Sequence, residues 1–163
     1  MNARVSKPLF PHTRGVRGFT LVEVMIVVSI AAVLMALSLP NFQFMLVNME
    51  IRGVSFDLVS QMTLARSEAL KRNAAVRIDA VGGDWNNGWQ VLFGANVLRE
   101  QGPVKRVDVA VTPVTASIRF TQTGRVANGS LAIQISDPTG TSPEISCVSV
   151  GLTGLAFSRK GAC

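Results

Sequence analysis

The sequence predicts an α+β protein in which one long N-terminal helix packs on an antiparallel β-sheet domain. Three patterns along its 163 residues lead to this fold class. An apolar run fills residues 19–39, apolar residues recur at three- and four-residue steps as far as residue 73, and apolar–polar alternation follows over residues 74–163. One helix followed only by short strands is typical of α+β architecture. We therefore expect a leader at 1–18, a helix at 19–73 and a β domain at 74–163.

The apolar run at residues 19–39 holds 21 consecutive positions with a single charge. As a helix it would be about 31 Å long, enough to cross a bilayer's hydrocarbon core. Four of the 16 basic residues precede it and all ten acidic residues follow residue 18, so we expect a cytoplasmic N-terminus and an exported β domain. A cleaved signal peptide would have a shorter apolar region and a small-residue cleavage site, which residues 40–42 do not provide.

Glu23 is the one charge within this apolar run. It would lie about 6 Å along the helix axis from Phe19, near the membrane interface, where an unpaired carboxylate is still unfavourable. Arg17 is six residues away, and the next basic residue is Arg52. An ordinary membrane anchor does not explain this glutamate, so we expect it to serve a function and to have a partner.

The segment Gly18-Phe19-Thr20-Leu21-Val22-Glu23, followed by an apolar helix and Pro40, resembles the prepilin signature of type IV pilins and type II secretion pseudopilins. The resemblance implies a type IV pilin-like fold, cleavage after Gly18 by a prepilin peptidase, and N-methylation of Phe19. It also implies that Glu23 meets the N-terminal amine of a neighbouring subunit in a filament. A plain anchor with an incidental glutamate is the alternative.

The helical pattern after Pro40 predicts a second, amphipathic helical half. Proline removes one backbone hydrogen bond, so we expect a kink or local break at Pro40. Glu68 and Arg72 form a favourable i,i+4 pair, and we expect the other charges to face solvent. The apolar positions expected to pack on the β domain are Val54, Leu58, Met62, Ala65 and Ala69.

Beyond residue 73 the period-two pattern predicts six or seven strands. Asn87-Gly88 and Asn128-Gly129 are turn signals. The residues that mark the strands are Val76, Ile78 and Ala80; Trp89, Val91 and Phe93; Val107, Val109 and Val111; Ile118 and Phe120; Leu131, Ile133 and Ile135; and the segments 145–150 and 155–158.

Later residues narrow the resemblance to the GspH/FimT subgroup of these proteins. The W-x-x-G-W element from Trp85 to Trp89, then Phe120 and the pair Gly124-Arg125, are similar to features of that subgroup. We expect the two tryptophans to pack in the core at a hairpin, and the alternative is a surface contact with a neighbouring pilin.

Cys147 and Cys163 are the only cysteines, and both lie in the last 17 residues. In an exported domain we expect them to form a disulfide that ties the chain end to a strand, worth roughly 2–3 kcal/mol in the chain-entropy model. Two unpaired thiols are the alternative.

The sequence argues against an enzyme, a metal site or a cofactor. The only histidine, His12, lies in the leader, so a catalytic triad and a histidine metal site are both excluded from the mature chain. The segment from Asp84 to Gly88 faintly resembles a calcium loop but lacks the distal glutamate, so we expect a turn there.

We expect a minor pilin or pseudopilin held in the inner membrane by a single span and then packed with other pilins into a type IV pilus. The alternative is a GspH-type subunit of a type II secretion system. A further alternative is DNA binding during uptake, with Arg125, Arg159 and Lys160 as candidate phosphate contacts. Some DNA-binding members carry a Gly-Arg-x-Arg run near the C-terminus, which residues 154–159 lack.

Overall fold

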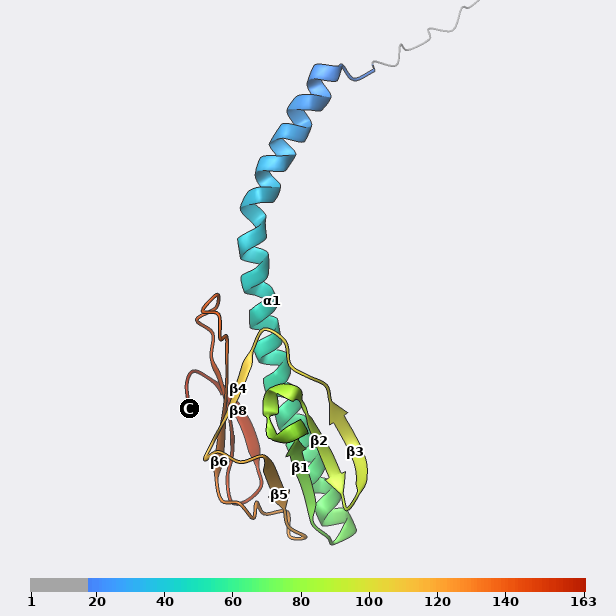
Figure 1. Cartoon of the computed structure of the whole chain (residues 1–163), viewed down its shortest axis with the longest axis vertical. Coiled ribbons are helices and arrows are strands. Elements are labelled where there is room, and N and C mark those ends of the chain that lie inside the picture. Colours follow the sequence, from blue (N-terminus) through green and yellow to red (C-terminus); the bar gives the residue numbers. More distant parts are fainter. Residues whose placement is uncertain (1–17) are drawn as a thin grey trace, which may run out of the picture. The chain divides into compact units, whose positions relative to one another are not determined.

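The computed structural model describes residues 18–163, apart from the side chains of residues 37–41. It divides into two compact units that meet between Leu39 and Pro40. Most of the expected leader therefore lies outside the described residues. One helix, α1, extends from Leu21 to Arg72 and contributes residues to both units (Figure 1). The helix is continuous through Pro40, so the local break is wrong, and the kink stays a prediction.

Both ends of α1 are capped by short-range hydrogen bonds. At the N-terminus the Thr20 hydroxyl accepts a hydrogen bond of 3.2 Å from the Glu23 amide, as an N-cap residue does. At the C-terminus Asn73 adopts a left-handed φ of 50°. The Asn73 amide bonds to the Leu70 carbonyl and the Ala74 amide to the Ala69 carbonyl, which together form a Schellman motif. The predicted helix end at residue 73 is therefore set by asparagine geometry.

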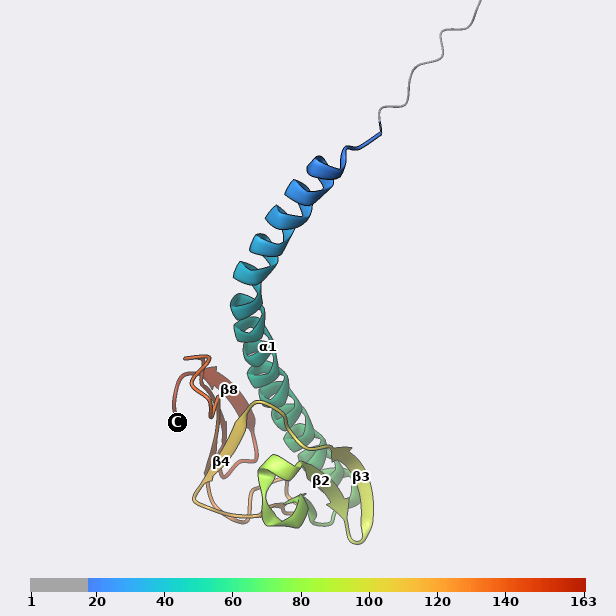
Figure 2. The ribbon, with the colours of Figure 1, turned by 45° about the horizontal axis from the view of Figure 1, so that its top comes forward.

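The β domain contains eight strands in two four-stranded antiparallel sheets. The first sheet has the order β3-β2-β1-β5 and the second the order β4-β6-β7-β8. In Figures 1 and 2 strands β4 and β8 of the second sheet lie on one side of the C-terminal half of α1, and strand β3 of the first sheet lies on the other. The strands are β1 (Val76–Ala80), β2 (Trp89–Phe93), β3 (Asn96–Gln101), β4 (Asp108–Thr112), β5 (Ser117–Phe120), β6 (Leu131–Ser136), β7 (Ser146–Val150) and β8 (Ala156–Lys160).

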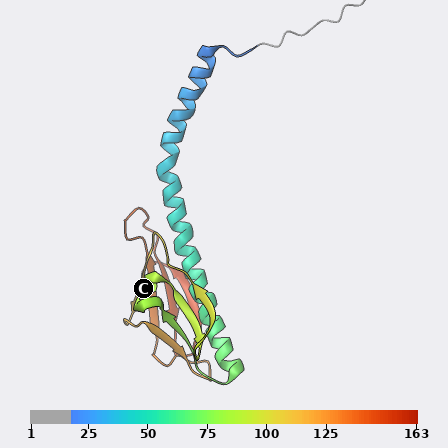
Figure 3. The ribbon, with the colours of Figure 1, turned by 45° about the vertical axis from the view of Figure 1, so that its right-hand side comes forward.

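The C-terminal half of α1 and the inner faces of both sheets enclose one core. Figure 3 shows this half of the helix running along the strands. All five residues of the predicted helical stripe are buried, and Val47 and Ile51 extend it toward the N-terminus. The predicted strand residues Ile78, Phe120 and Ile133 are fully buried beside them. The α+β prediction is therefore confirmed, down to the residues that carry the packing.

Trp85 and Trp89 lie in the core, as expected. Their ring centroids are 6.2 Å apart, and the Trp85 indole donates a 2.7 Å hydrogen bond to the Thr115 carbonyl. Two short 3-10 segments, η1 (Val81–Gly83) and η2 (Trp85–Asn87), bring the first tryptophan to this position. Gly88 follows with a φ of 91°, and a Cβ there would lie 2.1 Å from the Gln101 carbonyl oxygen, so only glycine fits.

Strand β3 was not predicted from the sequence. It is an edge strand with mostly exposed residues, so its sequence lacks the alternation that burial of one face imposes. A two-residue turn at Gly94, which has a φ of 60°, returns the chain from β2 to form it. The prediction of six or seven strands was therefore one or two short of the eight observed in this domain.

Candidate functional site

The predicted processing and assembly residues lie at the start of α1. Gly18 and Phe19 precede the helix and are exposed. A Cβ added at Gly18 would meet no atom within 4 Å of the described chain, so packing does not require glycine there. Glu23 lies in the first helical turn, where the helix dipole favours a negative charge. Among the residues that the structure describes, its carboxylate has no hydrogen-bond or ion-pair partner.

The helix after Glu23 exposes apolar side chains around its whole circumference. Five consecutive residues, Val24 to Val28, are each at least half exposed, and at 100° per residue they cover every side of the helix. A helix that is apolar all round needs an apolar environment or a partner. The large apolar residues of this segment, between 50% and 79% exposed, are Phe19, Leu21, Val22, Val24, Met25, Ile26, Val27, Val28, Ile30, Val33, Leu34 and Met35.

Among the described residues, no helix combines the length and the apolar character needed to cross a membrane. The span expected at residues 19–39 therefore stays a prediction.

A second apolar surface on α1 was missed by the sequence analysis. Phe42, Met45, Met49 and Phe56 are half or more exposed and follow one another at steps of three, four and seven residues. This spacing places them along one side of the helix and is typical of helix–helix contacts. The spacing of these four residues can be read from the sequence. It was not interpreted as a surface because the neighbouring apolar stripe, which packs on the β domain, has the same helical spacing.

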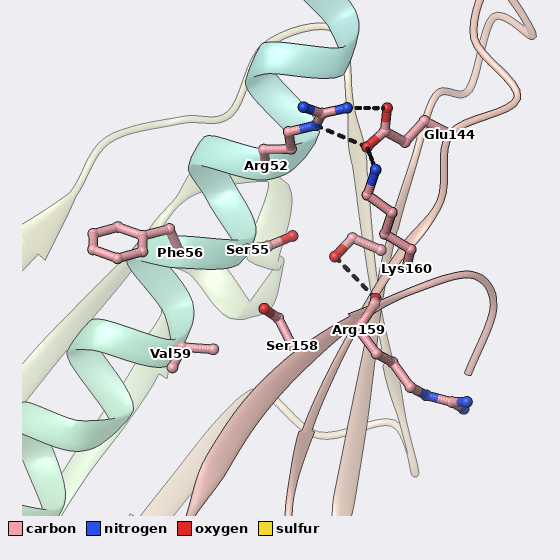
Figure 4. Close-up of a pocket in the computed structure, with 9 residues that line it drawn as sticks. Arg52, Ser55, Phe56, Val59, Glu144, Ser158, Arg159 and Lys160 are labelled. Atoms are coloured by element: carbon pink, nitrogen blue, oxygen red, sulfur yellow. Dashed lines mark hydrogen bonds and ion pairs between the residues drawn. The ribbon is translucent and has the colours of Figure 1, made fainter.

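A groove of about 430 Å³ lies between α1 and strand β8 (Figure 4). At its rim the Arg52 guanidinium donates two hydrogen bonds, of 2.9 and 3.0 Å, to the Glu144 carboxylate. Lys160 lies 4.0 Å from the same carboxylate. The hydrogen bonds from Arg52 and the charges of both bases hold the pKa of Glu144 below its usual range. Arg52 is thus not a merely solvated charge, because it joins the helix to the loop before β7.

The expected disulfide between Cys147 and Cys163 is present, with Cα atoms 5.1 Å apart. It attaches the chain end to β7. Arg159 reinforces this closure, because its guanidinium donates to the carbonyl oxygens of Ala162 and Cys163 at 3.3 and 3.4 Å.

The three candidate nucleic-acid contacts do not form one site. Arg159 and Lys160 line the groove beside α1, whereas Arg125 lies in the loop after β5 and lines a separate depression with Arg119. Arg159 binds carbonyl groups of the chain end, and Lys160 lies close to Glu144. The basic residues expected to contact phosphates are therefore divided between two places, and part of their charge is already matched.

The segment at Asp84 is a turn, as expected. Its carboxylate accepts a 2.9 Å hydrogen bond from the Asn86 amide and caps η2. Asn86 in turn donates to the Asp108 carboxylate and accepts from the Val109 amide, both at 2.9 Å, and so connects η2 to β4. Within the described residues no group of three or more histidine, cysteine or acidic side chains is positioned to hold a metal ion.

A prepilin-type start, an exposed apolar helix and a helix-packed β domain define the pilin-like class of filament subunits. Comparison with known proteins supports the same class. A family model described as type II transport protein GspH matches residues 57–154, which is more than half of the chain. The chain belongs to this family. A model of the prokaryotic N-terminal methylation motif matches residues 13–39. Members of this class are structural subunits and not enzymes.

Solved structures show the same fold. The chain is similar to a crystal structure of the type IV minor pilin FimU of Pseudomonas aeruginosa, with a TM-score of 0.57 and 19% identity over 71% of this chain and 90% of that one. A second crystal form of FimU gives the same TM-score and identity over 68% and 92% of the two chains. No curated protein matches the chain.

Proposed function

We propose that this chain is a minor pilin that is cleaved after Gly18, N-methylated at Phe19 and assembled into a type IV pilus. Before assembly the segment at 19–39 holds it in the inner membrane, with its N-terminus in the cytoplasm and the β domain in the periplasm. The observation that carries the proposal is the exposure of apolar side chains on every side of the first half of α1. Lipid covers this surface in the precursor, and the helices of other subunits cover it in the filament.

Glu23 fits a role in subunit contact. Its carboxylate has no partner among the described residues, although its amide is capped by Thr20. In a filament the N-terminal amine of an adjacent subunit, released by cleavage after Gly18, supplies the missing positive charge. Between apolar helices it is costly to leave either charge unpaired, so the presence of one charge favours docking of the other.

Two observations bear on the type of filament. The structural likeness to a type IV minor pilin supports the pilus, while the description of the matching family supports the alternative, a type II secretion pseudopilus.

A strain that lacks this chain distinguishes the pilus from the secretion pseudopilus. We expect loss of sheared surface pili with normal release of a type II substrate, and the opposite pattern would assign the chain to secretion. The separation of Arg125 from Arg159 and Lys160 does not favour a single DNA-binding surface.

The test of the assembly role is the substitution Glu23→Ala in the full chain. We expect normal cleavage, because Gly18 and the apolar helix are intact, but a loss of the chain from sheared filaments to below about a tenth of the native amount, since a missing ion-pair partner costs several kcal/mol in a buried site. Glu100→Ala is the matched control, because Glu100 is an exposed carboxylate on the edge strand β3. Equal incorporation of Glu23→Ala and native chains would refute the role of Glu23.

A further inference from the structure

Strand β8 has an unpaired edge. It is the last strand of its sheet and pairs only with β7. The Gly161 amide bonds to the Ile145 carbonyl at 2.8 Å, which fixes the alternation: residues 157, 159 and 161 direct their main-chain groups toward β7, and residues 156, 158 and 160 direct theirs outward. Among the described residues, nothing bonds to these outward groups.

The edge at β5 is covered by hydrogen bonds from the chain itself, and the edge at β4 is covered at one residue. At β5 the Asn128 side chain accepts a hydrogen bond from the Arg119 amide and donates one to the Ser117 carbonyl. The Ala127 amide donates a further hydrogen bond to the Arg119 carbonyl. At β4 the Asn86 side chain accepts from the Val109 amide. Since proteins commonly cover exposed edges in this way, the open edge of β8 is a place where a further strand can pair.

The groove beside α1 runs along this open edge. Figure 4 shows Ser158 of β8 facing Ser55 and Val59 of the helix. The helix side of the groove is apolar at Phe56, a residue that is 73% exposed, and at Val59. Ser55 does not reach across, because its hydroxyl donates to the Ile51 carbonyl of its own helix. A strand added to β8 would thus bury Phe56 against one of its faces.

The charge around the groove is positive. Arg52, Arg159 and Lys160 line it together with one acidic residue, Glu144. Arg52 already provides two hydrogen bonds to Glu144, so that Lys160, 4.0 Å away, is weakly engaged and 78% exposed at its side chain. A carboxylate on an incoming segment would therefore find a basic partner at the end of β8.

The edge is also held in place before anything binds. Cys147 is the cross-strand neighbour of Arg159 in β8, and its disulfide binds Cys163, four residues after Arg159. The disulfide therefore fastens the end of β8 to β7. A preformed edge binds a strand without the entropy cost of ordering its own backbone.

We propose that the open edge of β8 and its groove form a site for β-strand addition by an extended segment of another protein that alternates apolar and acidic side chains. Main-chain bonds to Ala156, Ser158 and Lys160 hold the segment, an apolar side chain covers Phe56, and a carboxylate pairs with Lys160. This contact is independent of assembly through residues 19–39, so either proposal can fail without the other.

The test uses the full chain in detergent micelles and a fluorescent eight-residue peptide of alternating valine and glutamate. We expect saturable binding by fluorescence anisotropy, and slower hydrogen exchange at the Ala156, Ser158 and Lys160 amides when the peptide is saturating. A peptide with lysine in place of glutamate should bind about tenfold more weakly or worse, because it meets the same positive charge.

Two substitutions locate the binding. Phe56→Ala should weaken binding by about tenfold, a typical loss for an aromatic contact residue. Phe157→Ala is the control, because Phe157 is a similarly exposed aromatic residue of β8 that does not line the groove. No binding at peptide concentrations up to about 1 mM (about −4 kcal/mol), binding without protection of the three amides, or equal losses in both variants would each overturn the proposal.

Discussion

The two halves of α1 are built from similarly apolar residues, yet they bury them in different ways. Between Val47 and Ala69 the large apolar side chains that face the β domain form one stripe and are fully or almost fully buried. Between Leu21 and Met35 the large apolar side chains occupy every side of the helix and remain exposed. The second half finds its partners within the chain, whereas the first half needs them from outside. A helix whose apolar residues form a single stripe can bury them against its own chain. A helix whose apolar residues occupy every side needs a partner from outside.

The largest expected effect on stability tests this difference directly. Leu58→Ala should lower the free energy of unfolding by about 2–5 kcal/mol, because it removes a fully buried side chain and leaves a cavity. Ile26→Ala should change it by no more than about 0.5 kcal/mol, since Ile26 is exposed in the isolated chain. Urea unfolding of the β domain, followed by tryptophan fluorescence in detergent, measures both.

A stability loss from Ile26→Ala as large as that from Leu58→Ala would break the comparison. It would mean that the first half of the helix packs within its own chain.

The disulfide gives the next largest effect, and it should be confined to the β domain. Cys163→Ser removes the link between β7 and the chain end. We expect a loss of roughly 2–3 kcal/mol in unfolding free energy, the value for closing a loop of about this length. Cleavage after Gly18 should be unaffected, and a mass measurement on the same preparation checks this. Unchanged stability after Cys163→Ser would show that the closure contributes little.

The smallest effect concerns the pair that joins α1 to the loop before β7. The pKa of Glu144 is lowered by its hydrogen bonds with Arg52, so the carboxylate adds stability above its unfolded pKa of about 4.3 and loses it as the pH falls through the lower folded value. Thermal melting should therefore show Glu144→Gln to be less stable than the native chain at pH 7 and equal to it at strongly acidic pH. A difference that grows on acidification would contradict the assigned pairing.

Much of this structure follows from patterns in the sequence. The stripe from Val54 to Ala69, the two core tryptophans and most strands were predicted because burial of one face imposes a period on the residues. Strand β3 was not, because an exposed edge strand imposes none. Pro40 predicted a kink or a local break, and the helix continues through it without a break.

The candidate site was only partly predictable. Gly18, Phe19 and Glu23 form a contiguous motif, and their roles depend on a short local pattern. The pairing of Arg52 with Glu144 joins residues 92 positions apart, and no local pattern indicates it. The open edge of β8 depends on which strands become neighbours, which the alternation of residues 156–160 does not specify. Contacts between residues far apart in the sequence were therefore the part of the site that local sequence patterns could not predict.

The central claim is that the exposed half of α1 is covered by other subunits after cleavage at Gly18. The most direct measurement is the intact mass of this chain in filaments sheared from the cell surface, with the Gly18→Ala variant analysed beside it. We predict a native chain that begins at Phe19 and carries one N-terminal methyl group, and no Gly18→Ala chain in the filaments. A filament chain that still begins at Met1, or incorporation of the uncleaved variant at the native level, would contradict the account.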